Sequence, residues 1–306
     1  MLRRGWMIVV LAGLVATGAA GQKPGKVTVR PTYEQGRRLR YQLKLSGATA
    51  WAPTIEGVKW GRMNTDFTFV LATKVLREEG LHKGCCTFNL LGEHLRSVGE
   101  GPNGAFGVDA TRERTQIKVK DRWQVSVEDK GPLTRPMTMT FGPLGGFRFG
   151  TGLAPVAIYM LPHVDHRFWT LLTVAPVQEV APGDGWEKAF ELPVPGSKGK
   201  PLELKGAWKV VGWETYRRRK VLAMTLDAEL DLKDSNVMLK NGDVVHVATG
   251  TYKAAGKVLW DVAGGVLCSA TADQKILIKA DKPSPRALRS ECNCSLQLLA
   301  ARTAPG

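Results

Sequence analysis

The chain has 306 residues, of which 43% are hydrophobic and 23% are charged. This composition is that of an ordinary globular protein and excludes a fibrous or disordered chain. The formal charge of +15 is spread along the sequence, so it does not favour a single nucleic-acid-binding patch.

The N-terminus predicts a secretory leader. Arg3 and Arg4 precede an uninterrupted apolar run, Trp6–Ala16, and small residues follow it, so we expect a signal peptide over residues 1–20. The run is shorter than the roughly 20 residues that span a bilayer, so the mature chain is not expected to be transmembrane. We therefore expect an exported protein, periplasmic or extracellular.

Export permits disulfide bonds, but the cysteines do not define a pairing. Their odd number leaves at least one thiol without an intramolecular partner, and both bridges and buried free thiols stay open. The five cysteines are Cys85, Cys86, Cys268, Cys292 and Cys294.

Alternation with a period of two predicts strands in the first half of the chain. In residues 38–47, leucines and a tyrosine alternate with charged and polar residues, as in a half-buried antiparallel strand. A hairpin is expected over residues 66–92, and a second hairpin carries Trp123. After an extended lead-in at 21–32, we predict a first β module over residues 33–145.

The middle of the chain has a different character. Residues 146–182 are expected to form a Gly-rich loop and a short helical connector, with one or two helices between about Leu153 and Leu172. Pro162 would interrupt them.

A second β module is predicted over residues 183–282. It begins with a strand after Gly183, continues with a hairpin around the turn "RRRK", and carries Trp260 where the first half carries Trp123. The same order of elements in both halves suggests an internal duplication. In the hairpin, leucines and a methionine alternate with Asp227 and its acidic neighbours, so the acids are expected to face solvent.

The expected fold is mainly β. It consists of antiparallel meander sheets in two related half-barrel-like or sandwich modules, joined by the helical connector. Residues 283–306 form a tail in which 291–299 returns as an edge strand.

Three stretches carry a resemblance to a known family. They are "GRRLRYQL" (Gly36–Leu43), "PVQEVAPGDGW" (Pro176–Trp186) and "GKVLWDVAGGVL" (Gly256–Leu267). With the secretory leader, they make the chain similar to a family of uncharacterised exported bacterial proteins over about residues 30–280. The resemblance implies an envelope β-protein and supplies no catalytic residues.

Few residues suggest chemistry. His163 and His166 could share a metal on one helix face, although a closed zinc site needs further ligands. The chain has no G-x-S-x-G nucleophile elbow, and the Gly-rich stretch 142–152 lacks the lysine and serine of a phosphate loop. We therefore predict neither catalytic residues nor a cofactor.

Tryptophans near loops or strand ends are candidates for a ligand surface, although tryptophan is also highly buried on average. They are Trp51, Trp60, Trp169 and Trp213.

The sequence favours a non-enzymatic envelope protein that binds an apolar or anionic ligand. The partner would be an anionic envelope polymer, a lipid or another envelope protein, and not nucleic acid. The alternatives are a hydrolase that acts on an extracellular polymer, and a purely structural interaction module.

Overall fold

The computed structural model places most of the residues that it describes in β-strands. These residues are 25–32, 36–53, 61–78, 86–101, 104–119, 122–125, 133, 137–142, 145–149, 175–176, 178–192, 202–238, 244–282 and 286–302.

The structure describes fifteen strands. In the first half they are β1 (Arg38–Pro53), β2 (Gly61–Glu78), β3 (Cys86–Gly101), β4 (Gly104–Thr111), β5 (Thr115–Val119), β6 (Arg122–Val125), β7 (Met137–Gly142) and β8 (Gly145–Phe149). In the second half they are β9 (Gly185–Leu192), β10 (Leu202–Tyr216), β11 (Arg219–Asp231), β12 (Ser235–Met238), β13 (Val244–Asp261), β14 (Val266–Lys282) and β15 (Arg286–Arg302).

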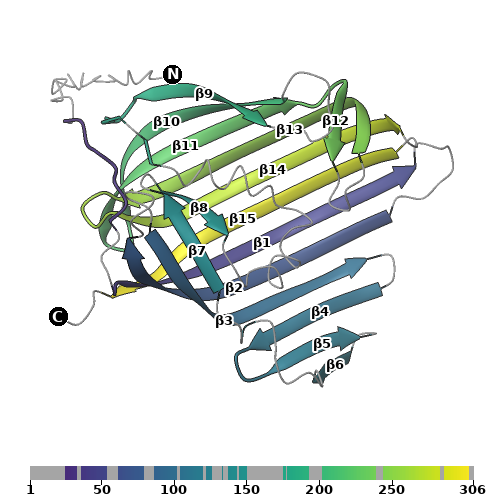
Figure 1. The fold of residues 1–306 in the computed structure, drawn as a ribbon, viewed down its shortest axis with the longest axis horizontal. Coiled ribbons are helices and arrows are strands. Elements are labelled where there is room, and N and C mark those ends of the chain that lie inside the picture. The colour runs from purple at the N-terminus through teal and green to yellow at the C-terminus, as the bar shows by residue number, and fades with distance from the viewer. Residues whose placement is uncertain are drawn as a thin grey trace, which may run out of the picture.

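One antiparallel sheet contains all of these strands. Its order is β6-β5-β4-β3-β2-β1-β15-β14-β13-β11-β10-β9, while β12 pairs with β13 and β7 pairs with β3 and β8 (Figure 1). The prediction of a mainly β, antiparallel protein is therefore confirmed. The strands of both predicted modules lie in this single sheet, which is continuous across the pairing of β1 with β15.

The position predicted for the tail strand is wrong. β15 is not an edge strand, because it pairs with β1 on one side and with β14 on the other. The alternation of Cys292, Cys294 and Leu298 with polar residues fits an edge strand and a central strand equally well. The choice depends on partners about 250 residues away, such as Leu45 opposite Cys294.

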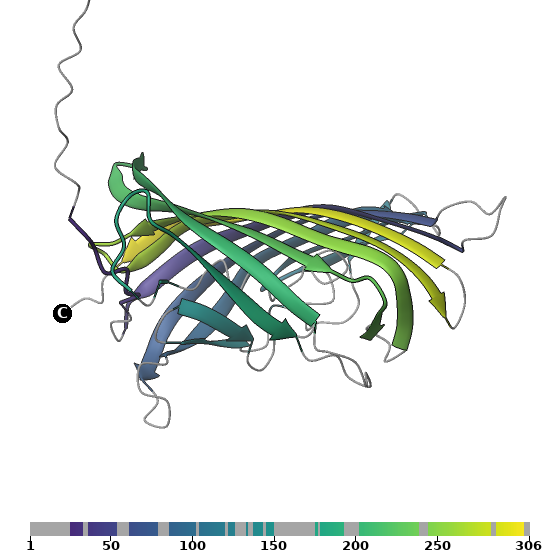
Figure 2. The same ribbon diagram turned by 90° about the horizontal axis from the view of Figure 1, so that it is seen from above.

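The sheet is bent, and Figure 2 shows it arching over one side. Its two faces differ in polarity. On β11, Leu222, Met224 and Leu226 are almost completely buried, whereas Asp227 and Glu229 on the opposite face are exposed. We call the apolar face that carries these three residues the inner face, and the opposite face, on which Asp227 and Glu229 are exposed, the outer face. This confirms the predicted orientation of the acidic residues.

The matching of two tryptophans in the duplication argument is wrong. Trp260 lies on the inner face and is 3% exposed. Trp123 pairs with Lys118 on the outer face, where its ring covers Gly107, and it is 37% exposed. Two hairpins with similar sequences therefore place their tryptophan side chains on opposite faces of the sheet.

The junction between the two halves forms the tight turn that its sequence predicts. Gly183 has a φ of +91°, a conformation that favours glycine. The Asp184 carboxylate accepts a hydrogen bond from the Ala181 amide at 2.9 Å, and β9 begins at Gly185. The expected helices between Leu153 and Leu172 lie outside the described residues.

Candidate ligand-binding face

The inner face is mostly apolar from β10 across to β5. The register of the strands aligns its side chains in transverse rows, so that Leu43, for example, lies between Phe69 of β2 and Leu296 of β15. At the β5 end the face opens, since Ile117 is 36% exposed. An apolar surface of this extent is unusual unless something packs on it.

One transverse row consists almost entirely of small residues. Each member pairs directly with the next across eight consecutive strands, from β3 to β10. The members of this small-residue row are Gly99, Thr65, Gly47, Cys292, Gln274, Ala254, Ala228 and Gly206. With neighbouring strands about 4.8 Å apart, the row is roughly 34 Å long.

Aromatic rings close both ends of the small-residue row. A Cβ atom at Gly99 would collide with the ring of Phe106, and one at Gly206 would lie 2.9 Å from the ring of Trp208. Trp208 in turn stacks on Trp186, with 5.9 Å between ring centroids. In the middle of the row, Gly47 is half-buried, whereas Cys292 and Gln274 beside it are each 2% exposed. The open middle of the row is therefore the position of Gly47.

The central strands leave aliphatic side chains partly accessible on the inner face. These half-buried residues are Leu43, Ile276, Ile278, Leu288 and Leu296. Each belongs to β1, β14 or β15 and lies two or four residues along its strand from the row. Water that contacts them would be released if an apolar chain covered them.

Two buried polar atoms on the inner face lack hydrogen-bond partners among the described residues. They are the Ser97 hydroxyl and the indole nitrogen of Trp260. By contrast, the Thr49 and Ser290 hydroxyls bond each other at 3.0 Å. A polar group of a ligand could form a hydrogen bond with the Ser97 hydroxyl or the Trp260 indole nitrogen. A buried polar atom that lacks such a partner costs about 1–3 kcal/mol.

Three cysteines on the central strands and at one end of the sheet are free and buried. They are Cys268, Cys292 and Cys294, so the free-thiol alternative holds for these three. Burial raises the pKa of Cys292 to about 12 and also raises the pKa values of Cys268 and Cys294. Protonated thiols are poor nucleophiles and poor metal ligands. Cys85 lies outside the described residues, and so does the side chain of Cys86.

Polar contacts close one end of the inner face. The Tyr41 hydroxyl donates to the Leu267 carbonyl at 3.1 Å, and burial raises the pKa of Tyr41 well above its usual range. Beside it, Arg37 donates to the carbonyls of Thr32 and Gly264 at 3.1 and 3.0 Å. We call this the closed end of the sheet.

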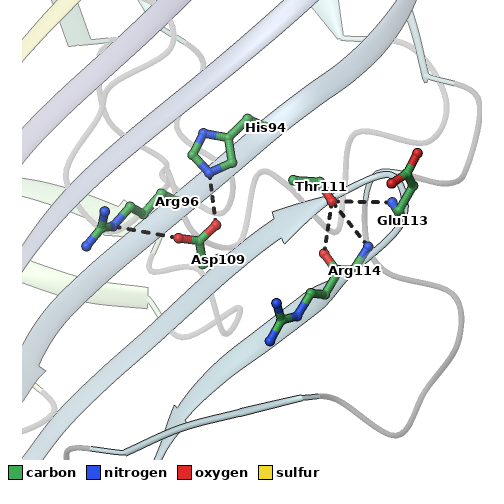
Figure 3. A network of polar contacts seen from close by, with 6 residues as sticks. All are labelled: His94, Arg96, Asp109, Thr111, Glu113 and Arg114. Atoms are coloured by element: carbon green, nitrogen blue, oxygen red, sulfur yellow. Dashed lines mark hydrogen bonds and ion pairs between the residues drawn. The ribbon is translucent and has the colours of Figure 1, made fainter.

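The outer face carries a polar network that sequence reasoning did not single out. His94 Nε2 lies 2.9 Å from one oxygen of Asp109, and Arg96 lies 4.0 Å from the other oxygen (Figure 3). Nearby, the Thr111 hydroxyl accepts hydrogen bonds from the amides of Glu113 and Arg114 and stabilises the β4–β5 turn. The register of β3 and β4, which places His94 near Asp109, is the signal that a single sequence lacks.

The structure describes only some of the site residues that the sequence predicts. Trp213 lies on β10, with the Lys220 ammonium 4.6 Å from its ring centroid. Trp51 lies on β1 opposite Leu288, but its side chain is not described. His163, His166, Trp60 and Trp169 fall outside the described residues. Within the described part of the chain, no group of three or more potential metal ligands comes together.

The geometry defines a single-sheet, antiparallel β protein with an apolar inner face. No family model matches the sequence, and no curated protein is similar to it. Across the described residues, no helix has the length and apolarity needed to cross a bilayer.

Two of the solved structures that match this chain do so with low TM-scores. One is a structure titled "Lipid-protein interactions in lipovitellin", with a TM-score of 0.43, 12% identity, and coverage of 90% of this chain but only 26% of that one. The other is DynF from the dynemicin biosynthesis pathway of Micromonospora chersina, with a TM-score of 0.22, 10% identity, and coverage of 92% and 89%. The chain thus spans about a quarter of the lipovitellin chain. At these scores neither likeness carries an argument about function.

Proposed function

We propose that this protein is an exported, non-enzymatic binding protein that holds an aliphatic chain on the inner face of its sheet. The observation that carries the proposal is the middle of the small-residue row. There Gly47 is half-buried, and so are Leu43 and Leu296, four residues farther along β1 and β15, although all three lie on the central strands. A sheet that served only as a scaffold would fill this position with larger side chains.

A linear apolar ligand fits this face better than a compact one. The row runs across the strands for roughly 34 Å, with small residues along its floor and aromatic rings at its ends. About 15 buried methylenes would contribute ~12 kcal/mol. After an association cost of at least ~4 kcal/mol, about 8 kcal/mol remains, which corresponds to a Kd of about 1 µM.

A fluorescent fatty acid tests the proposal directly. The wild-type protein should bind the probe with a Kd of about 1 µM, and Gly47→Leu should weaken binding at least about tenfold, because the new side chain occupies the row. Ser46→Leu is the matched control, since Ser46 is the exposed outer-face neighbour of Gly47 on the same strand. Melting temperatures of both variants establish that they fold.

Two results would overturn the proposal. One is that the wild-type protein does not bind the probe. The other is that Gly47→Leu and Ser46→Leu bind it equally well while both remain folded. N-terminal sequencing of protein secreted with its own leader tests export, and a mature N-terminus at Gly21 is expected.

A further inference from the structure

The turn between β10 and β11 has an unusual composition. Tyr216 pairs with Arg219, so the turn consists of Arg217 and Arg218 alone. Their φ angles are +49° and +66°, which places both in the left-handed region. A two-residue turn of this kind normally contains Asn-Gly, because side chains with a Cβ are strained there. Two arginines therefore occupy turn positions whose left-handed backbone conformation disfavours side chains with a Cβ atom.

Two of the four cations in and beside this turn are held by neutral groups. Arg217 donates to the Leu298 carbonyl at 2.6 Å and lies 5.4 Å from the Tyr216 ring centroid. Lys220 lies over the ring of Trp213. Of the ion pairs between described residues, only that of Arg219 with Asp261, at 2.9 Å, involves this turn.

Arg218 is the most available of these cations. It is exposed, and among the described residues its side chain forms neither a hydrogen bond nor an ion pair. Arg217 and Lys220 are also exposed, so three positive charges face solvent without a carboxylate partner among the described residues. Neighbouring cations without counter-ions repel one another, and a bound anion would relieve that repulsion.

The turn lies over the closed end of the sheet. β13 and β14 separate β11 from β15, so three strand spacings, roughly 14 Å, lie between β11 and Leu298 in a flat sheet. Arg217 reaches the Leu298 carbonyl only because the hairpin bends across the ends of those two strands. The turn is thus fixed in position by this hydrogen bond.

We propose that residues 216–220, the basic tip, dock this protein on the anionic headgroups of a lipid membrane. Arginine binds phosphate oxygens through paired hydrogen bonds, and tryptophan and tyrosine favour the membrane interface. Trp213 and Tyr216 lie directly behind the cations, and Val211 beside them is 50% exposed. The choice of a membrane rests on the proposed function, because membranes are the source of aliphatic-chain ligands.

The turn itself supplies the decisive variant. Arg217→Asn with Arg218→Gly creates the preferred Asn-Gly turn, so it removes two cations while it relieves backbone strain. The double variant should fold as well as the wild type, although it loses the bond to Leu298. Each cation near an anionic surface strengthens binding about fivefold at low salt, so affinity for vesicles should fall about 25-fold.

Co-sedimentation with vesicles measures the effect. Wild-type protein should bind vesicles of phosphatidylglycerol and phosphatidylcholine, release them as salt is raised, and bind vesicles of phosphatidylcholine alone much more weakly. The matched control is Lys209→Gln with Lys279→Gln, which removes two exposed cations from the outer face. This control should bind within about twofold of the wild type.

The docking proposal is overturned if the Asn-Gly variant and the lysine control bind anionic vesicles equally. It is also overturned if dextran sulfate binds the wild type while anionic vesicles do not, since the partner is then a soluble polyanion. Fatty-acid probe binding separates the two proposals. The Asn-Gly variant should still bind the fatty-acid probe. If the wild-type protein does not bind the probe, the proposed function is wrong, and the vesicle experiment still tests the docking proposal independently.

Discussion

Two regions of the same inner face are built in different ways. On β10 and β11 the face carries large side chains, and Leu222, Met224 and Leu226 are at most 1% exposed. On β15 and β1 the row of Met224 carries Leu296 and Leu43, which are half-buried, and the row of Leu226 carries Cys294 and Leu45. The sheet is continuous across both regions, so the difference lies in the side chains.

This contrast separates the part of the face that stabilises the fold from the part that is free to bind. Large, fully buried residues contribute the most hydrophobic free energy, about 1.5–3 kcal/mol each. A centre lined with small residues gives up part of that contribution. Such a departure from close packing is expected at a functional site and not in a scaffold.

Truncation of matched leucines should give the largest difference. Leu226→Ala on the packed flank should lower the free energy of unfolding by about 3 kcal/mol, because it leaves a cavity in a closed environment. Leu296→Ala in the centre should cost about 1 kcal/mol, since part of its side chain already contacts solvent. Urea unfolding of both variants measures the gap.

Leu277→Ala provides the baseline for that experiment. Leu277 lies on the outer face and is 49% exposed, so its truncation should change stability by at most about 0.5 kcal/mol. Equal losses for Leu226→Ala and Leu296→Ala would mean that the centre is packed as tightly as the flank, and the comparison would fail.

Two glycines of the small-residue row sharpen the comparison. Gly206→Ala should cost about 2 kcal/mol, because the new Cβ would lie 2.9 Å from two atoms of the Trp208 ring. Gly47→Ala should be neutral or stabilise by up to about 0.5 kcal/mol, since glycine weakens a strand and this position is half-buried. Thermal unfolding distinguishes the two, and a large loss at Gly47 would contradict an open middle.

Local features of the fold could be predicted from the sequence. The alternation around Leu43 on β1 and Leu226 on β11 predicted which side chains are buried, because a strand places alternate residues on opposite faces. The turn at Arg217 and Arg218 and the strand after Gly183 were predicted from the residues that interrupt the alternation. These predictions need only neighbours in sequence.

The small-residue row could not be predicted in the same way. It exists because eight strands share one register, and a shift of one residue in β15 would turn Cys292 away from Gly47. The pairing of β1 with β15 joins residues about 250 positions apart, which no local pattern specifies. For the same reason, β15 was wrongly placed at an edge, and the proximity of His94 to Asp109 was missed.

The smallest expected effect concerns the thiols of the central strands. In the folded protein burial raises the pKa of Cys292 from 9.0 to about 12, so the native state holds this proton after the unfolded chain has lost it. The stabilisation is complete below pH 9 and is lost as the pH rises toward 12. By about pH 10 the loss should be about 1 kcal/mol. Urea unfolding at pH 8 and pH 10 should therefore show a steeper decline for the wild type than for Cys292→Ala. Equal declines, or rapid reaction of the native protein with a thiol reagent at pH 8, would mean that water reaches Cys292 and that the open middle extends beneath it.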